Sequence, residues 1–196
     1  MEVQVIFALS LAIFFFNGAG PQLSSTGFEL ATQASLNLNV PPPWSGRFWG
    51  RTHCVTTDSK FQCATADCGS GQITCNGGGA IPPASLIEFT LAPNNGKDFY
   101  DISLVDGFNL PLAVTPHGRL LGCNTTSCAA DVNTVCPSEL QVKGLGGGNS
   151  PATCQPTKYS KIFKSQCPQA YSYAYDDKTS TFTCTGGANY LVTFCP

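Results

Sequence analysis

Charged residues are scarce in this chain of 196 residues, since Asp, Glu, Lys and Arg together make up 11% of it. The ten basic residues form no run, and the formal net charge is −2, so the composition gives no reason to expect a nucleic-acid partner. The only histidines are His53 and His117, and neither a CxxC pair nor a GxSxG motif occurs. We therefore expect no bound metal or cofactor and no Ser-His-Asp or Cys-His site.

Cysteine, glycine and proline are abundant by contrast, with 11, 20 and 14 residues respectively. Eleven cysteines in a chain of this size indicate an oxidising compartment and a disulfide framework. The number is odd, and their connectivity does not follow from the sequence alone. Many turn-forming residues and few charges are typical of a chain rich in turns and poor in helix.

The N-terminus carries an apolar run, Val5–Phe16, that has the length of a signal-peptide core and is too short to span a bilayer. Small residues at 18–20 could form a cleavage site, so we expect a signal peptide over residues 1–20 and one domain over residues 21–196. A membrane anchor or a buried strand is the alternative. No later run is long enough to cross a membrane.

Short segments with period-two alternation of apolar and polar residues follow one another along the chain. They are residues 35–40, 47–52, 85–91, 102–104 and 190–194. One short helix is expected over Tyr159–Ser165, with Ser160 as its cap. Alternating strands separated by turn signals predict an all-β sandwich. The composition of the glycine-rich stretch Lys143–Ser150 predicts a flexible loop.

Two long blocks carry a resemblance to a known family. The first contains GRFWGRTHC, FQCATADCGSGQITC and IEFTLAPNNGKDFYDISLVDGFNLP; the second contains YSKIFKSQCPQAYSYAYDDKTSTFTC and NYLVTFCP. Together they resemble the thaumatin-like proteins, a pathogenesis-related plant defence family, over most of residues 21–196. The resemblance implies a flattened β-sandwich with disulfide-braced loops, secreted to the extracellular space (the apoplast) or held in the vacuole.

The resemblance also implies four disulfides, which are Cys54–Cys63, Cys68–Cys75, Cys123–Cys184 and Cys128–Cys167. Two family features are missing from the sequence: the first strand, and a cysteine-rich loop domain that an internal deletion near residues 144–154 removes. Three cysteines then lack family partners. Either Cys136 pairs with Cys154 and Cys195 stays free or joins two chains, or all three thiols stay free or scrambled. We otherwise expect a monomer, with an exposed sheet edge where the strand is lost.

In the family an Arg, a Glu and three Asp residues line a cleft, and the matching positions here are Arg47, Glu88, Asp101, Asp106 and Asp176. Arg51 and Asp177 are the competing assignments for the first and last of these. From the residues alone, carboxylates at strand ends equally well cap turns, and Asp67 in the ATADC segment is expected to do so.

Crowded carboxyls suit glycoside hydrolysis, which needs one protonated and one ionised group. We expect Glu88 as the acid, with Asp101 or Asp106 as its catalytic partner. Aromatic residues that could stack on sugar faces are Trp49, Phe99, Tyr100, Phe108 and Tyr173. Loss of the loop domain removes one wall of the cleft, so we expect weaker pKa tuning there.

Three functions stay open at this point. The first is a secreted antifungal protein whose cleft binds β-1,3-glucan-type carbohydrate of the fungal cell wall and is at most a weak endo-β-1,3-glucanase. The second is a non-catalytic defence protein that acts on membranes or proteins, and the third is a truncated isoform without independent function. Asn124, in the sequence Asn-Thr-Thr, is a glycosylation acceptor.

Overall fold

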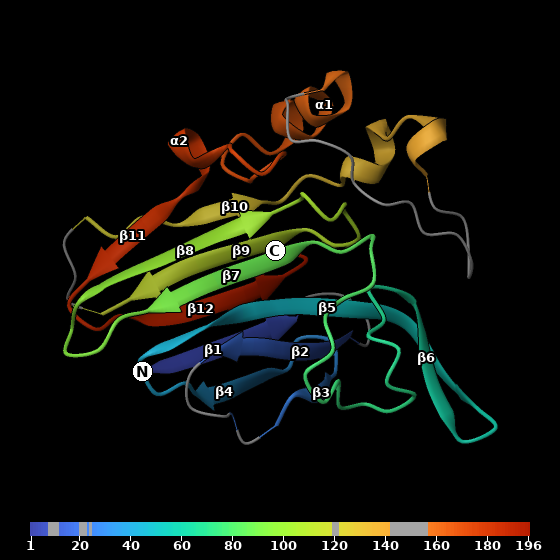
Figure 1. Ribbon diagram of the computed structural model, residues 1–196, viewed down its shortest axis with the longest axis horizontal. Helices are drawn as coiled ribbons and strands as arrows, with labels where there is room; N and C mark the ends of the chain where they lie inside the picture. The colour runs from blue at the N-terminus through green and yellow to red at the C-terminus, as the bar shows by residue number, and fades with distance from the viewer. Residues whose placement is uncertain (8–11, 20–22, 24, 119–121, 142–156) are drawn as a thin grey trace.

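The fold is an all-β sandwich of two sheets, seen in a computed structural model (Figure 1). It describes residues 1–7, 12–19, 23, 25–118, 122–141 and 157–196. The thaumatin-type sandwich expected from the sequence is confirmed, and the inner faces of the two sheets enclose one main core.

One sheet has five strands in the order β10-β9-β12-β1-β4. These are Thr126–Cys128 (β10), Leu112–His117 (β9), Asn189–Phe194 (β12), Glu2–Phe7 (β1) and Ser35–Asn39 (β4). Alternation directs Tyr190, Val192 and Phe194 of β12 into the core, where each is 0–1% exposed.

The other sheet runs in the order β11-β8-β7-β5-β2-β3. Its strands are Phe182–Thr185 (β11), Lys97–Ser103 (β8), Leu86–Leu91 (β7), Trp44–Thr57 (β5), Ala12–Ala19 (β2) and Gly27–Leu30 (β3). The far half of β5 leaves the sheet and pairs with β6, Lys60–Thr65, as a hairpin that extends beyond the sandwich (Figure 1).

The N-terminal segment forms two strands of the sandwich, and the expected loss of the family's first strand stays a prediction. β1 pairs with β12 on one side and with β4 on the other, and β2 lies between β5 and β3. Val3 and Val5 alternate with polar residues and are fully buried, so this end of the chain has a strand pattern of its own. The edge strands of this sheet are β10 and β4, and β4 lies next to β1. Signal-peptide cleavage stays a prediction, and removal of residues 1–20 would take both strands out of the sandwich.

Helices lie on the side of β10 and β11 (Figure 1). They are the 3-10 turns Val132–Val135 (η1) and Ser138–Leu140 (η2) and the helices Lys158–Gln166 (α1) and Asp177–Ser180 (α2). The helix expected near 159–165 is present as α1, but Thr157 is its cap and Ser160 closes the reciprocal capping box. Among the described residues, no helix has the length and apolarity to cross a membrane. The predicted deletion at 144–154 lies outside the described residues.

Four disulfides brace the loops, and they join the pairs that the family resemblance implied. Cys123–Cys184 closes the longest loop, of 61 residues, and ties the segment before β10 to β11. Cys136 and Cys195 are free thiols in the described part of the chain. The bridge from Cys136 to Cys154 is therefore not formed at Cys136, while Cys154 lies outside the described residues.

Candidate functional site

A row of three charged side chains crosses three neighbouring strands on the outer face of the larger sheet. Arg47 of β5 pairs in register with Glu88 of β7, and Glu88 pairs with Asp101 of β8. Their strand neighbours, such as Phe48 and Ile87, point the opposite way and are fully buried in the core. Period-two alternation plus register thus brings together residues that are far apart in sequence.

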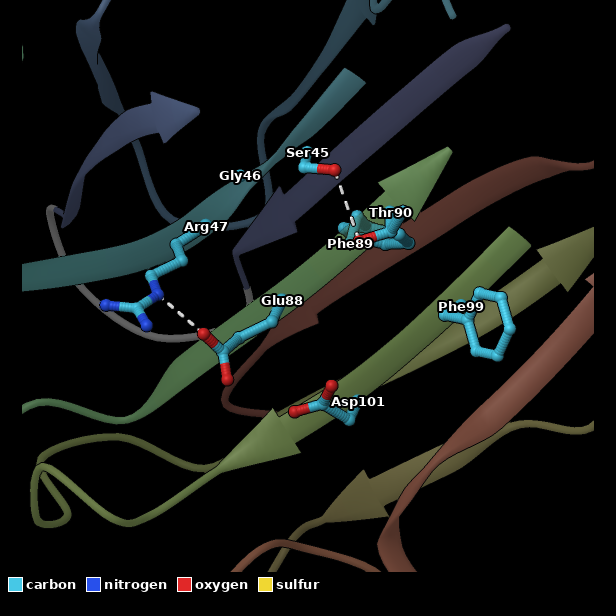
Figure 2. Close-up of a pocket in the computed structure, with 8 residues that line it drawn as sticks. All are labelled: Ser45, Gly46, Arg47, Glu88, Phe89, Thr90, Phe99 and Asp101. Atoms are coloured by element: carbon cyan, nitrogen blue, oxygen red, sulfur yellow. Dashed lines mark hydrogen bonds and ion pairs between the residues drawn. The ribbon is translucent and has the colours of Figure 1, made fainter. Parts of the chain in front are cut away.

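An ion pair joins the first two members of the row. Arg47 Nε lies 2.5 Å from Glu88 Oε1, with the side chains 53% and 31% exposed. Figure 2 shows the guanidinium bent toward Glu88, with Asp101 on the far side of the glutamate. The pair uses Nε of the guanidinium and leaves its two other nitrogens directed away from Glu88 (Figure 2).

Asp101 lies in an environment that disfavours its charged form. Its Oδ2 atom is buried and has no hydrogen-bond partner among the described residues. Burial first, and then the negative charge of Glu88, raise the pKa of Asp101 to about 8, against the opposing effect of Arg47. Asp177 adds a further raising effect. Asp101 is therefore protonated at neutral pH beside an ionised carboxylate.

Two adjoining hollows of about 300 Å³ each share Arg47, Glu88 and Asp101, and together they form the acidic cleft. One extends over Ser45, Thr90 and Phe99, and the other reaches Ser103, Asp106 and Tyr171. Arg47, Glu88, Asp101 and Asp106 thus line one cleft, as the resemblance implied. Volumes of this size are at the small end for ligand sites.

Asp106 also serves the turn that its sequence suggested. Its carbonyl accepts the backbone N–H of Ala84, and Gly107 beside it has a φ of 98°. A Cβ at Gly107 would lie 2.8 Å from Pro83, so glycine is required there on two counts. Both interpretations of Asp106 therefore hold at once.

Asp176 does not belong to the cleft, and this corrects the expectation from the sequence. Its Oδ2 lies 2.9 Å from Lys164 Nζ of α1 and accepts both the N–H and the hydroxyl of Ser172. Burial opposes ionisation of Asp176, but these bonds outweigh it and lower its pKa. The neighbouring Asp177 is the residue whose charge acts on Asp101, and it accepts a hydrogen bond from Tyr171 at 2.8 Å.

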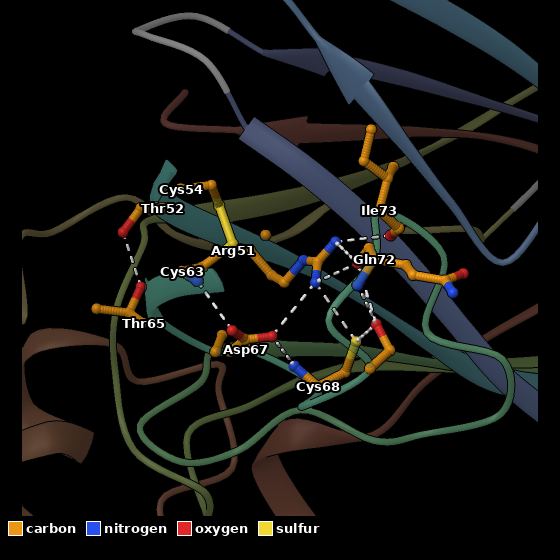
Figure 3. Close-up of a disulfide and its surroundings, with 12 residues drawn as sticks. Arg51, Thr52, Cys54, Cys63, Thr65, Asp67, Cys68, Gln72 and Ile73 are labelled. Atoms are coloured by element: carbon orange, nitrogen blue, oxygen red, sulfur yellow. Dashed lines mark hydrogen bonds and ion pairs between the residues drawn. A yellow bond between two sulfur atoms is a disulfide. The ribbon is translucent and has the colours of Figure 1, made fainter. Parts of the chain in front are cut away.

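Arg51, the other candidate for the arginine of the cleft, is buried and structural. Its guanidinium contacts Asp67 at 3.3 Å and donates to the carbonyl of Ile73 at 2.6 Å (Figure 3). Asp67 also accepts backbone N–H groups of Cys63 and Cys68, so its predicted role as a turn cap is confirmed. The pKa of Arg51 is lowered to about 10, because burial lowers it more than the neighbouring charge of Asp67 raises it.

Of the aromatic residues near the acids, Phe99 is 43% exposed and lines the cleft. Trp49, Tyr100 and Phe108 are at most 6% exposed and belong to the interior, so they cannot stack on a sugar. Asn124 is exposed, and its carbonyl accepts the hydroxyl of Tyr100 at 2.5 Å. Its use as a glycosylation site stays a prediction.

Sequence reasoning missed Tyr171, and it ranked Asp176 above Asp177, whose charge is the one that acts on Asp101. The only signal for either was the pair of aspartates in YAYDD, and no alternation extends through this irregular segment to say which one faces outward.

Comparison with known proteins adds family and fold. A sequence model described as the Thaumatin family matches residues 7–149 and 144–196. A protein of Prunus avium named glucan endo-1,3-beta-glucosidase is 59% identical over 90% of this chain and 81% of its own length. Pathogenesis-related protein 5 of Arabidopsis thaliana is 48% identical over 91% of this chain and 82% of its own. The solved structure of the thaumatin-like xylanase inhibitor TLXI, 20% identical, aligns with a TM-score of 0.61 over 99% of both chains and supports the fold.

Proposed function

The chain belongs to the thaumatin family, and on this premise we propose that it is a secreted plant defence protein whose acidic cleft binds β-1,3-glucan and hydrolyses it weakly. The observation that carries the proposal is that Asp101, whose Oδ2 is buried and whose pKa is raised to about 8, lies directly across from Glu88 on the neighbouring strand. A relative 59% identical to the chain is named as a glucan endo-1,3-beta-glucosidase. Four disulfides support an oxidising, extracellular setting.

The roles within the pair are the reverse of those expected from the sequence. Asp101 holds its proton at neutral pH, so we assign it as the acid that protonates the leaving glycosidic oxygen. Glu88, which forms an ion pair with Arg47, is the carboxylate that we assign to attack the anomeric carbon. Water then enters, gives a proton back to Asp101, and releases the sugar from Glu88.

The spacing of the pair bears on stereochemistry. Directly opposed residues of antiparallel strands have Cβ atoms about 4.5–5.5 Å apart. That spacing suits the roughly 5–5.5 Å between carboxyls in retaining glycosidases better than the roughly 6.5–9.5 Å in inverting ones. We therefore expect retention at the anomeric carbon. Turnover should be slow, since the Arg47 side chain is half exposed and the cleft is open to water.

Laminarin is the probe for the test. Wild type, Glu88→Gln and Asp101→Asn are compared for laminarin binding by calorimetry and for release of reducing ends. We expect both variants to lose laminarin binding. We also expect the rate at which they release reducing ends to fall by at least about 100-fold. Asp58→Asn is the matched control, because Asp58 is an exposed turn residue with a φ of 50° that asparagine tolerates. Laminarin binding that persists unchanged in both cleft variants would refute the proposal.

A further inference from the structure

Tyr171 lies on the wall of the acidic cleft, and none of the family motifs assigns it a role. Its backbone is pinned beside the end of β8: its N–H donates to the carbonyl of Ile102, and its carbonyl accepts the N–H of Leu104, both at 2.8 Å. These two bonds flank Ser103, which pairs with Tyr171 as a short parallel bridge. The backbone of Tyr171 is thus fixed beside Ser103, which follows Asp101 by two positions on β8.

The side chain of Tyr171 connects this fixed point to α2. Its hydroxyl donates to Asp177 Oδ1 at 2.8 Å and also hydrogen-bonds the hydroxyl of Thr181. Tyr171 and Asp101 line the same hollow of the cleft. An aspartate at the start of a four-residue helix would otherwise be free to turn its carboxylate to solvent.

We propose that Tyr171 is a positioning residue of the acidic cleft, and that it holds the Asp177 carboxylate on the side of Asp101. The inference rests on the proposed function for its catalytic meaning, but the geometry exists without any ligand. It makes the C-terminal segment, rather than the sheet alone, part of the acid's environment.

Several other charges act on the same carboxyl and must be kept constant in a test. The groups around Asp101 are Glu88 of β7, Arg47 of β5, Asp106 after β8, and Asp177 and Tyr171 of the C-terminal segment. Burial and the nearby carboxylates raise the pKa of Tyr171 itself to about 12, so its hydroxyl stays a donor throughout the neutral range. Of these charged groups, Asp177 is the one that hydrogen-bonds the hydroxyl of Tyr171.

The test is the titration of Asp101 in the unliganded protein, followed by carbon-13 NMR of its carboxyl group. We expect Asp177→Asn to lower the pKa of Asp101 by about half a unit or more, because a like charge is removed. Tyr171→Phe should shift it in the same direction, since the ring remains but Asp177 is no longer held. The controls are Tyr175→Phe, at a tyrosine 70% exposed in the same segment, and Asp58→Asn, which makes the same charge change at a distant turn.

An Asp101 titration that is the same in wild type and all four variants would overturn the inference and reduce Tyr171 to a structural residue. The pH dependence of laminarin hydrolysis gives the second readout, and its alkaline limb should move down with the pKa of Asp101. Should the NMR shifts appear while the wild type neither binds nor cleaves laminarin, the positioning by Tyr171 stands and the proposed function fails.

Discussion

Replacing Asp101 by asparagine should stabilise the protein, and the gain should grow with pH. An aspartate in an unfolded chain has a pKa of 3.8, whereas Asp101 in the folded protein has a pKa of about 8. Between these values the folded protein carries a proton that the unfolded chain has lost. Stability therefore falls as pH rises through this window, by linkage. Asparagine resembles the protonated carboxyl and does not titrate, so it removes this loss.

The size of the effect follows from the window. Each pH unit in which the folded and unfolded chains differ by one proton changes the free energy of unfolding by about 1.4 kcal/mol. From about pH 4 to about pH 8 the ceiling is roughly 5 kcal/mol, and relaxation around the carboxylate reduces it. We expect Asp101→Asn to match wild type near pH 4 and to exceed it by about 2–4 kcal/mol near pH 8.

The assay is equilibrium unfolding in urea, with the disulfides intact, at a series of pH values for both proteins. Other titrating groups cancel in the difference between the two curves, so only the pH dependence of that difference is read. Asp58→Asn should give a flat difference, because Asp58 is exposed in a turn. A flat difference for Asp101→Asn as well would show that Asp101 ionises normally in the folded protein, and both the acid's role and the raised pKa would be wrong.

Three further outcomes follow from the structure. Arg51→Met should cost about 2–4 kcal/mol in urea unfolding and make the loop around Cys68–Cys75 sensitive to protease, because Arg51 is fully buried and the change removes the ion-pair partner of Asp67. Wild-type stability would contradict the structural role of Arg51. Asp176→Asn should lower the free energy of unfolding by about 1–3 kcal/mol at neutral pH, and this difference from wild type should shrink as pH falls below about 4, since Asp176 contributes stability through its lowered pKa only while its carboxylate is ionised. A pH-independent difference would mean that Lys164 does not act through charge. A chain beginning at Pro21 lacks β1 and β2, which leaves β12 and β5 each without one of its neighbours and opens the core, so we expect no cooperative unfolding transition. A cooperative transition near that of the full chain would show that both strands are dispensable. Mass spectrometry of the secreted protein would show which form occurs.

Strand alternation predicts much of the site, but not all of it. Arg47, Glu88 and Asp101 each stand at an outward position of an alternating strand, and the register then places them in one row. The same alternation puts Arg51 on the face of Arg47. What separates them is the loop after β6, which covers Arg51 and leaves Arg47 exposed. A covering loop leaves no periodic signal, so the two arginines could not be told apart from the sequence.

Adjacent aspartates outside a strand pose a harder problem. Asp176 and Asp177 point apart because Lys164 of α1 holds one and Tyr171 holds the other. Both partners come from segments whose arrangement is tertiary. The N-terminus stayed open from the sequence for a different reason, since a run of apolar residues fits a signal-peptide core as well as it fits strands buried between neighbours. Only pairing with β12 and β5 distinguishes them.

The environment of the acid explains why a lost loop domain need not abolish the chemistry. From the sequence, removal of one wall was expected to weaken pKa tuning in the cleft. In this chain the pKa of Asp101 is raised to about 8 with burial as the largest cause, and weaker tuning than in a chain with the loop domain stays a prediction. The groups that raise it are in the chain itself, since Glu88 comes from the neighbouring strand and Asp177 from α2. The tuning seen here therefore comes from residues that the chain itself supplies. A more enclosed cleft should mainly lengthen the time for which a glucan stays bound, because binding gains most from enclosure.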